Sequence, residues 1–350
     1  MERFQEEFIS NLLEWNAVKI APDREHYFKL KSGRMSPYFV NMATAMDSGK
    51  RLWQTAEAYA GSVIPSDNDD IVAHGPAMKG IPLVPLIAAE SWRLDRAAMK
   101  YAFDFKEGPV QISQDALIGV KLRHEKPGIK ILDTLDAGTL KHTECNSVSA
   151  VALANDLYGR FVRNYSPDDV DVIVGKAYGG IGPAALLARE IAGRDNVDIR
   201  FVYDRVSAKT HGVSGESSFV GRLEENDRAL VVDGHLESIG SVFGHVGDGE
   251  RLRAFDDVIT TGKAKRESKH KVEKRYPKAE WAGVHVAVYR GEVDETGKTV
   301  PEALEEHGLA PLSWIVTAEE IFEFAHESKR IDDRAMDDFK TYMKEFGAKA

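Results

Sequence analysis

Short apolar runs, each followed by Gly or Asp and then by a helical pattern, constrain the fold of this 350-residue chain more than any other feature. The clearest runs are residues 71–73, 172–174, 229–232 and 284–288. Strands that alternate with helices predict βαβ units and a mostly parallel sheet. We therefore expect an α/β fold whose ligands lie at the carboxyl ends of the strands.

The chain also resembles itself after a shift of 100 residues. Residues 69–90 share nine identical positions with residues 169–190, and the register continues from 101–104 to 201–204 and from 131–133 to 231–233. Chance similarity between two βα units is the alternative to a duplicated α/β core. We favour duplication because one shift holds over three separate elements.

A second, shorter similarity aligns residues 221–234 with residues 244–257. It leaves open which of the strands ending at Asp233 and Asp256 enters the central sheet. We interpret one of the two as an added hairpin strand.

Charge and cysteine content exclude several classes of protein. The formal net charge of −10 argues against a general nucleic-acid binder, although a few local lysines can still bind a small anion. One cysteine, Cys145, excludes a disulfide framework and a cysteine-rich zinc site, and it fits a reducing compartment.

No apolar run approaches a membrane span of about 18 residues, and the N-terminus is too charged for a signal peptide. We expect a cytoplasmic protein without a membrane partner.

The strongest chemical motif is Phe-Asp-Asp-Val-Ile-Thr-Thr-Gly at residues 255–262. Backbone N–H groups of such a turn, followed by a helix N-terminus, form a phosphate cradle. The two carboxylates cannot bind phosphate and must face ribose hydroxyls or a cation. A plain strand–turn–helix joint is the simpler alternative. The basic run after it, residues 263–274, is interpreted as a solvated helix face because acids are interspersed.

This motif resembles the phosphoribosyl pyrophosphate (PRPP) loop of type I phosphoribosyltransferases. Residues 28–41, 75–82, 209–212 and 342–347 are similar to segments of the orotate phosphoribosyltransferase family. The resemblance covers residues 1–90 and about 183–350, with some 100 residues in excess between Pro82 and Pro183. It implies a type I phosphoribosyltransferase-like parallel sheet flanked by helices, with an apparently duplicated core. The expected domains are an N-terminal hood (1–65), a first core with a degenerate phosphate loop (66–145) and a second core with the intact loop (146–350).

The resemblance also implies a role for each matching residue. The implied PRPP contacts are Lys31, Lys79, Arg205, Lys209, His211, Asp256, Asp257, Val258, Ile259, Thr260, Thr261, Gly262, Lys263 and Ala264. The implied orotate contacts are Phe39, Val40, Thr260 and Arg290. The implied catalytic residues are Lys209, His211 and Asp257.

Arg205, Lys209 and His211 would sit on a mobile loop that usually closes from a neighbouring subunit. No residue is expected to ligate a metal directly, because PRPP oxygens would hold the Mg²⁺ near Asp256 and Asp257. Two departures from the family pattern stand out. Val206 replaces a second basic residue, and Met78 replaces a tyrosine.

Each copy of the repeat lacks part of the family pattern. Leu132 replaces the first acid of the loop-like segment 132–139, and Gly179 stands opposite Lys79. We therefore expect one composite site per chain, formed where the two cores meet as an intramolecular pseudo-dimer. A conventional homodimer that carries the extra segment as an insertion is the alternative.

The implied function is transfer of phosphoribose from PRPP to orotate, giving orotidine 5′-phosphate and diphosphate in de novo pyrimidine biosynthesis. A PRPP- or nucleotide-sensing regulator and a phosphoribosyltransferase for another base remain alternatives. The degenerate copy and Val206 favour a regulator, whereas Lys209, His211 and the intact loop favour an enzyme.

Overall fold

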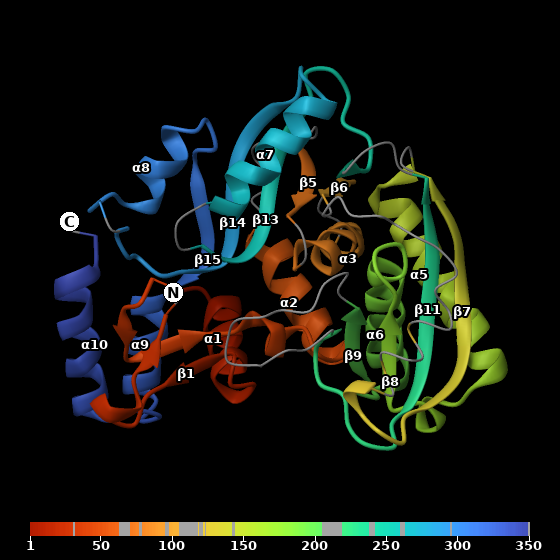
Figure 1. Cartoon of the computed structure of the whole chain (residues 1–350), viewed down its shortest axis with the longest axis horizontal. Helices are drawn as coiled ribbons and strands as arrows, with labels where there is room; N and C mark the ends of the chain where they lie inside the picture. Colours follow the sequence, from red (N-terminus) through yellow and green to blue (C-terminus); the bar gives the residue numbers. More distant parts are fainter. Residues whose placement is uncertain are drawn as a thin grey trace.

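The computed structural model describes residues 1–348 except 31, 63–70, 77–78, 95–97, 105–117, 119–121, 123, 142–143, 205–218, 238–241, 260–262 and 295. Two mostly parallel sheets stand on either side of a layer of helices (Figure 1). This arrangement confirms the expected α/β fold class. Within the described ranges, no helix is long and apolar enough to cross a bilayer.

The first sheet has the order β12-β6-β5-β13-β14-β15. Its strands are β5 (Ile71–Gly75), β6 (Lys100–Asp104), β12 (Val242–Phe243), β13 (Arg251–Ile259), β14 (Glu280–Tyr289) and β15 (Leu312–Thr317). The second sheet has the order β10-β9-β8-β11-β7. Its strands are β7 (Lys130–Lys141), β8 (Val172–Gly175), β9 (Arg200–Asp204), β10 (Phe219–Val220) and β11 (Arg228–Glu237). Among the described strands of these sheets, the short β10 and β12 pair antiparallel and the others pair parallel.

The two sheets do not follow one another along the chain. The first takes β5 and β6 from before the second sheet and β12 to β15 from after it. The expected boundary between residues 145 and 146 therefore does not coincide with the partition of strands, since β13 pairs with β5 and β7 pairs with β11. Asp233 lies in β11 and Asp256 lies in β13, and each of these strands pairs on both sides within its own sheet. The interpretation of one of them as an added hairpin strand is therefore wrong. The division into domains itself stays a prediction.

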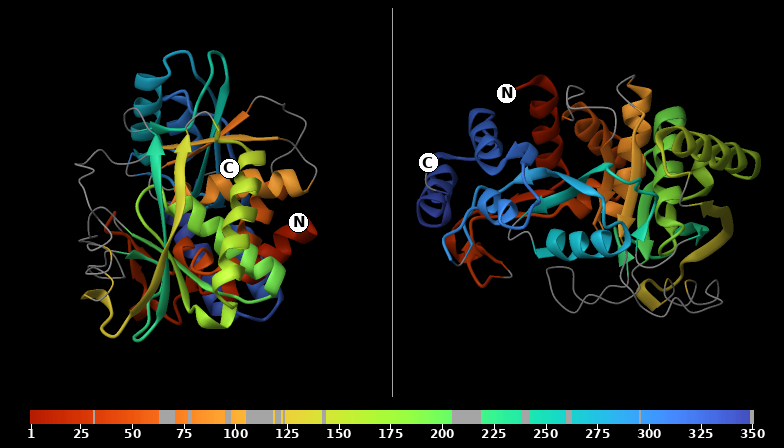
Figure 2. Two further views of the ribbon diagram at one scale, coloured as in Figure 1. Left: turned by 90° about the vertical axis from the view of Figure 1, so that its right-hand side faces the viewer. Right: turned by 90° about the horizontal axis from the view of Figure 1, so that it is seen from above.

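Four helices form the layer between the sheets. They are α2 (Gly49–Ser62), α3 (Gly80–Arg93), α5 (Ser147–Asn164) and α6 (Ile181–Asp195). Helices α3 and α6 are buried along most of their length, which is the position expected of helices that are apolar on every side. They lie side by side in both the front view and the view from above (Figures 1 and 2).

The N-terminal hood and the C-terminus pack together at the end of the molecule away from the second sheet (Figure 1). This region comprises α1 (Arg3–Glu14), β1 (Val18–Ile20), η1 (Arg24–His26), β2 (Phe28–Lys29), β3 (Met35–Ser36), β4 (Tyr38–Val40), η2 (Met42–Ala45), α9 (Ala318–Glu327) and α10 (Asp333–Phe346). Tyr38 anchors it, because its ring lies 5.5 to 6.0 Å from the rings of Phe322, Phe339 and Tyr342. Strand β4 is thus held against the C-terminal helices.

Helix α7 (Lys263–Arg275) packs against the first sheet, and its basic sequence is not a solvated face throughout. Lys265, Ser268 and Val272 are buried. The interpretation of residues 263–274 as a solvated helix face is therefore wrong for the side of the helix that faces the sheet. Lys265 and Lys271 on that side pair with Asp256 and Asp104 of the sheet. Two further short helices of the described residues are η5 (Pro167–Asp169) and α8 (Val300–Glu305).

Candidate active site

The candidate site lies at the carboxyl edge of the first sheet. Strand β13 runs parallel to β5 on one side and β14 on the other, so these three strands end at the same edge. Asp256 and Asp257 stand near the end of β13, Lys79 follows β5, and Arg290 follows β14. The topology therefore brings three distant segments of sequence together where parallel sheets bind ligands.

Lys79 and Asp257 form an ion pair across this edge. The Lys79 side chain is 34% exposed and that of Asp257 is 10% exposed, so about a third of the lysine side chain remains open to solvent. Burial alone would raise the pKa of Asp257, but Lys79, together with Lys265 and the hydrogen bond to Asp256, outweighs burial and the pKa lies below its usual range. Asp257 is consequently a carboxylate at neutral pH.

Asp256 has a separate partner, Lys265 of α7. Its carbonyl oxygen accepts a hydrogen bond from the Tyr59 hydroxyl at 2.6 Å, and its carboxylate accepts one from the Asp257 N–H at 2.9 Å. Burial raises the pKa of Asp256, and Lys265 only partly offsets this rise. The two adjacent aspartates thus differ in both partner and electrostatics.

Lys265 is a site residue that the sequence analysis missed. It lies in the first turn of α7, directly after the loop that leaves β13, and it is only 4% exposed. Its contact with Asp256, nine residues earlier, shows that the first turn of the helix lies over the end of the strand. The neighbouring residues include several lysines, so residue type alone could not single out Lys265. Its place in the first turn of the helix that follows the motif could have done so.

Arg290 joins the end of β14 to the hood. Its guanidinium donates to Glu292 at 2.9 Å, to the Tyr38 hydroxyl at 3.2 Å and to Ser36 Oγ at 3.4 Å. It also lies over the Tyr38 ring, 4.5 Å from the centroid. Arg290 is 5% exposed, so the structure presents it as a buried connector between the sheet and the hood.

Phe39 and Val40 lie next to Tyr38 in β4 and are half-buried. They pair with Lys19 and Val18 of β1. The hood strand is therefore held from two sides, by β1 and by the contacts of Tyr38 with Arg290.

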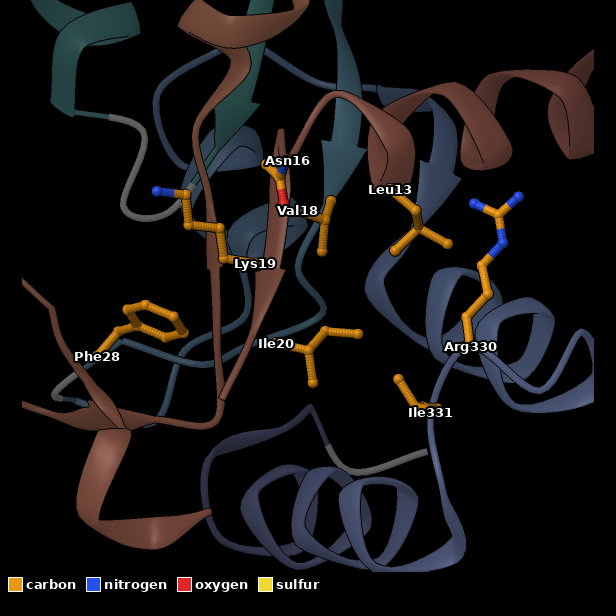
Figure 3. Close-up of a pocket in the computed structure, with 8 residues that line it drawn as sticks. All are labelled: Leu13, Asn16, Val18, Lys19, Ile20, Phe28, Arg330 and Ile331. Atoms are coloured by element: carbon orange, nitrogen blue, oxygen red, sulfur yellow. The ribbon is translucent and has the colours of Figure 1, made fainter. Parts of the chain in front are cut away.

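A cavity of about 590 Å³ opens beside β1 (Figure 3). Its lining residues are Leu13, Asn16, Val18, Lys19, Ile20, Phe28, Arg330 and Ile331. Among the described residues, none of those expected to bind PRPP or orotate lines it. The cavity adjoins the hood strand pair but is not the site that the motifs indicate.

Several expected site residues lie outside the described residues. They are Lys31, Arg205, Lys209, His211, Thr260, Thr261 and Gly262. Lys263 and Ala264 begin α7, and Val258 and Ile259 end β13. Among the described residues, no group of three His, Cys, Asp or Glu side chains could hold a metal.

Comparison with known proteins identifies the family. No model of a known family matches the sequence. The orotate phosphoribosyltransferase of Kluyveromyces lactis is 34% identical over 142 residues, or 40% of this chain and 60% of that protein. The orotate phosphoribosyltransferase of Yarrowia lipolytica is 32% identical over 188 residues, or 51% of this chain and 82% of that protein. The chain belongs to the orotate phosphoribosyltransferase family.

Orotate phosphoribosyltransferases of known structure give a weaker likeness. The Francisella tularensis enzyme is 18% identical with a TM-score of 0.44, covering 97% of this chain and 99% of that chain. The family resemblance expected from the motifs is confirmed by the sequence relatives. The match to the first of these relatives spans about 60% of the relative's length and about 40% of this chain.

Proposed function

We propose that this chain transfers the phosphoribosyl group of PRPP to orotate, giving orotidine 5′-phosphate and diphosphate. The observation that carries the proposal is the contact between Lys79 and Asp257, which joins two family motifs 178 residues apart at the carboxyl edge of one sheet. The relatives that carry this activity in their names support it. The proposal includes a cytoplasmic location and a place in pyrimidine biosynthesis.

The PRPP site would be assembled around β13. The partly exposed ammonium of Lys79 would meet pyrophosphate oxygens, while Asp256 and Asp257 would face the ribose hydroxyls. Backbone groups from Val258 to Ala264 would hold the 5′-phosphate, as expected for a turn that enters a helix N-terminus. Lys31, Arg205, Lys209 and His211 would supply the further positive charge that a polyanionic substrate needs.

The orotate site would lie between the hood strand and the end of β14. Backbone groups of Phe39 and Val40 would meet the base, and Thr260 would contribute from the loop. Arg290 is already paired with Glu292 and stacked on Tyr38, so we assign it a positioning role for the hood strand. This assignment differs from the direct orotate contact that the family resemblance implies.

Catalysis would rest on orientation and charge. Departure of diphosphate leaves a ribose with oxocarbenium character, which the orotate ring nitrogen attacks at C1. Lys79, Lys209 and His211 would neutralise charge on the leaving group, and the carboxylate of Asp257 would fix the ribose hydroxyls. A preorganised arrangement of this kind avoids reorganisation of water during the reaction.

Mg²⁺ fits this site as an ion carried by PRPP. Asp256 and Asp257 each contact a lysine, and this donor set does not form a metal site built from protein side chains alone. When bound with PRPP, the ion would supply charge neutralisation of the pyrophosphate. Asp256 and Asp257 would lie near the ion without ligating it directly.

The test is turnover of PRPP with orotate and with other bases in the presence of Mg²⁺. Asp257→Asn should lower kcat by ~10²-fold or more, the range for a charge-stabilising group. Asp233→Asn is the control, because Asp233 lies in β11, the corresponding strand of the second sheet, where it pairs with Lys176. PRPP binding without turnover of any base would favour the regulator, and turnover only with another base would replace orotate as substrate.

A further inference from the structure

Contacts across the layer between the two sheets come in matched pairs. The segment before α2 hydrogen-bonds to the start of β9, and the segment before α5 hydrogen-bonds to the start of β6. The bonds are Gly49 N to Ile199 O (2.8 Å), Phe201 N to Asp47 O (2.7 Å), Ser147 N to Met99 O (2.9 Å) and Tyr101 N to Cys145 O (2.9 Å). The 100-residue shift relates Met99 to Ile199 and Tyr101 to Phe201. Reciprocal contacts of this kind are the signature of a twofold interface.

A pair of buried glutamates at the centre of the layer follows the same shift. Glu90 of α3 and Glu190 of α6 are equivalent under the shift, and each is 1% exposed. Arg189 donates to Glu90 at 2.6 and 3.1 Å and to Glu190 at 3.3 Å. Arg93 donates to Glu90 at 2.6 Å and also to Glu190. Two buried carboxylates thus share two guanidinium groups, one from each helix, which satisfies charges that would otherwise be costly to bury.

Helix packing follows the pattern as well. Helix α2 packs on α6, and α5 packs on α3, while α3 and α6 meet each other. We call the first sheet with α2 and α3 the first unit, and the second sheet with α5 and α6 the second unit. The two helices of each unit therefore cover the two helices of the other (Figure 1). A second copy of the chain would find these faces already occupied.

The strand registers of the two units agree in detail. Leu252 of β13 pairs with Val72 of β5, and Ala229 of β11 pairs with Val172 of β8. The shifts of 23 and 100 residues that relate these strands also relate Asp257 to Gly234 and Lys79 to Gly179. The second unit has glycines at both positions where the first has an ion pair.

In the second unit, the backbone at Gly179 and Gly234 occupies the position that the Lys79–Asp257 pair has in the first. A Cβ atom on Gly179 would lie 1.9 Å from the carbonyl oxygen of Gly234, so no lysine fits there without moving the loop. The Lys176 N–H also donates to the Val232 carbonyl at 3.0 Å, which ties the loop to the end of β11. Asp233, the equivalent of Asp256, is paired with Lys176 at 2.6 Å. The space at this strand end is therefore filled by the protein's own backbone.

We propose that the second sheet, with α5 and α6, is a built-in partner subunit that completes a twofold interface within one chain while its own strand-end site is closed. The catalytic unit is then a single chain with one PRPP site, at β13. The interface part of this proposal stands on geometry alone, and the identity of the ligand rests on the proposed function.

The test combines sedimentation of the full chain with calorimetric titration of PRPP and Mg²⁺. We expect a monomer of 38.8 kDa whose activity per chain does not change on dilution. We also expect one PRPP per chain. Lys79→Ala should abolish binding, and the matched variant Lys176→Ala should leave both stoichiometry and affinity within about twofold of wild type, with circular dichroism confirming that both variants fold.

The outcomes separate this proposal from the proposed function. A dimer that loses activity on dilution, two PRPP per chain, or weakened PRPP binding in Lys176→Ala would each overturn the built-in partner while orotate turnover could still be measured. A monomer that binds one PRPP but turns over no orotate would support it and contradict the proposed function. Absence of PRPP binding would overturn the single-site part together with the proposed function.

Discussion

Replacement of Lys79 by Met tests the ion pair at the centre of the candidate site. The substitution removes the ammonium and keeps an unbranched side chain of similar length. Asp257, whose side chain is 10% exposed, then loses the lysine that lowers its pKa most and remains beside a second buried carboxylate, Asp256. The variant should therefore be less stable than the wild type.

The size of the loss follows from burial. Breaking a fully buried pair by removing one partner costs about 3–5 kcal/mol. Because the Lys79 side chain is 34% exposed, solvent screens the interaction, and we expect the free energy of unfolding to fall by ~2 kcal/mol at about pH 8.

The loss of unfolding free energy in Lys79→Met should also depend on pH, and it should become smaller as the pH falls. In the wild type the lowered pKa of Asp257 stabilises the fold above the unfolded pKa, and this stabilisation disappears as pH falls. In Lys79→Met the pKa of Asp257 should rise above its unfolded value, so that protonation relieves the unpaired charge. The difference between variant and wild type should therefore shrink from about pH 8 to about pH 4.5.

Urea unfolding at several pH values measures this difference, and PRPP titration measures the functional consequence. The double variant Lys79→Met/Asp257→Asn should recover much of the stability without recovering PRPP binding. Lys176→Met is the control, because it breaks the Lys176–Asp233 pair of the second unit and should leave PRPP binding intact. A stability loss below about 0.5 kcal/mol that does not vary with pH would refute the electrostatic reasoning.

Three further predictions concern buried groups. Glu90→Ala should lower the free energy of unfolding by about 3–5 kcal/mol in urea titrations, since Arg93 and Arg189 lose a shared carboxylate. Burial opposes ionisation of Asp104, but His74 and Lys271 lower its pKa to about 2. Asp104→Asn should thus remove ~2 kcal/mol of stability that the wild type has above about pH 4 and loses toward pH 2, as followed by unfolding midpoints across that range. Burial raises the pKa of Cys145 to about 12, so iodoacetamide should label the native thiol far more slowly than the unfolded one in a timed mass-spectrometric assay.

The sequence predicts the α/β class because alternation of strands and helices is a local pattern. It does not predict which strands share a sheet. Strands β11 and β13 have similar sequences 23 residues apart, and their choice between β8 and β5 depends on contacts distant along the chain. The sequence therefore left the partition of strands undecided.

The sequence predicted only part of the candidate site, because some of its contacts also depend on segments that are distant along the chain. Lys79 and Asp257 were expected to serve one ligand because both match family motifs, and the structure places them in contact. Lys265 and the Arg290–Glu292 pair were not expected to be buried, since charged residues in a sequence are usually exposed. Paired burial of charge depends on where two segments meet, and composition alone does not reveal it.

The buried glutamates did leave a signal in the sequence. Glu90 and Glu190 occupy the same position in two helices that are otherwise mostly apolar. A charged residue repeated on an apolar helix indicates a partner of opposite charge inside the fold. That signal pointed to the interface between the two units rather than to the ligand site.

The central claim is that this chain makes orotidine 5′-phosphate at the site formed by β13, the segment after β5 and the hood. Incubation of the purified chain with orotate, PRPP and Mg²⁺, followed by chromatographic and mass-spectrometric measurement of products, tests it most directly. We predict equimolar orotidine 5′-phosphate and diphosphate from the wild type, with a loss of ~10²-fold or more in Asp257→Asn and little change in Asp233→Asn. Intact orotate after exhaustive incubation of the folded protein, or equal activity in Asp257→Asn and wild type, would contradict it.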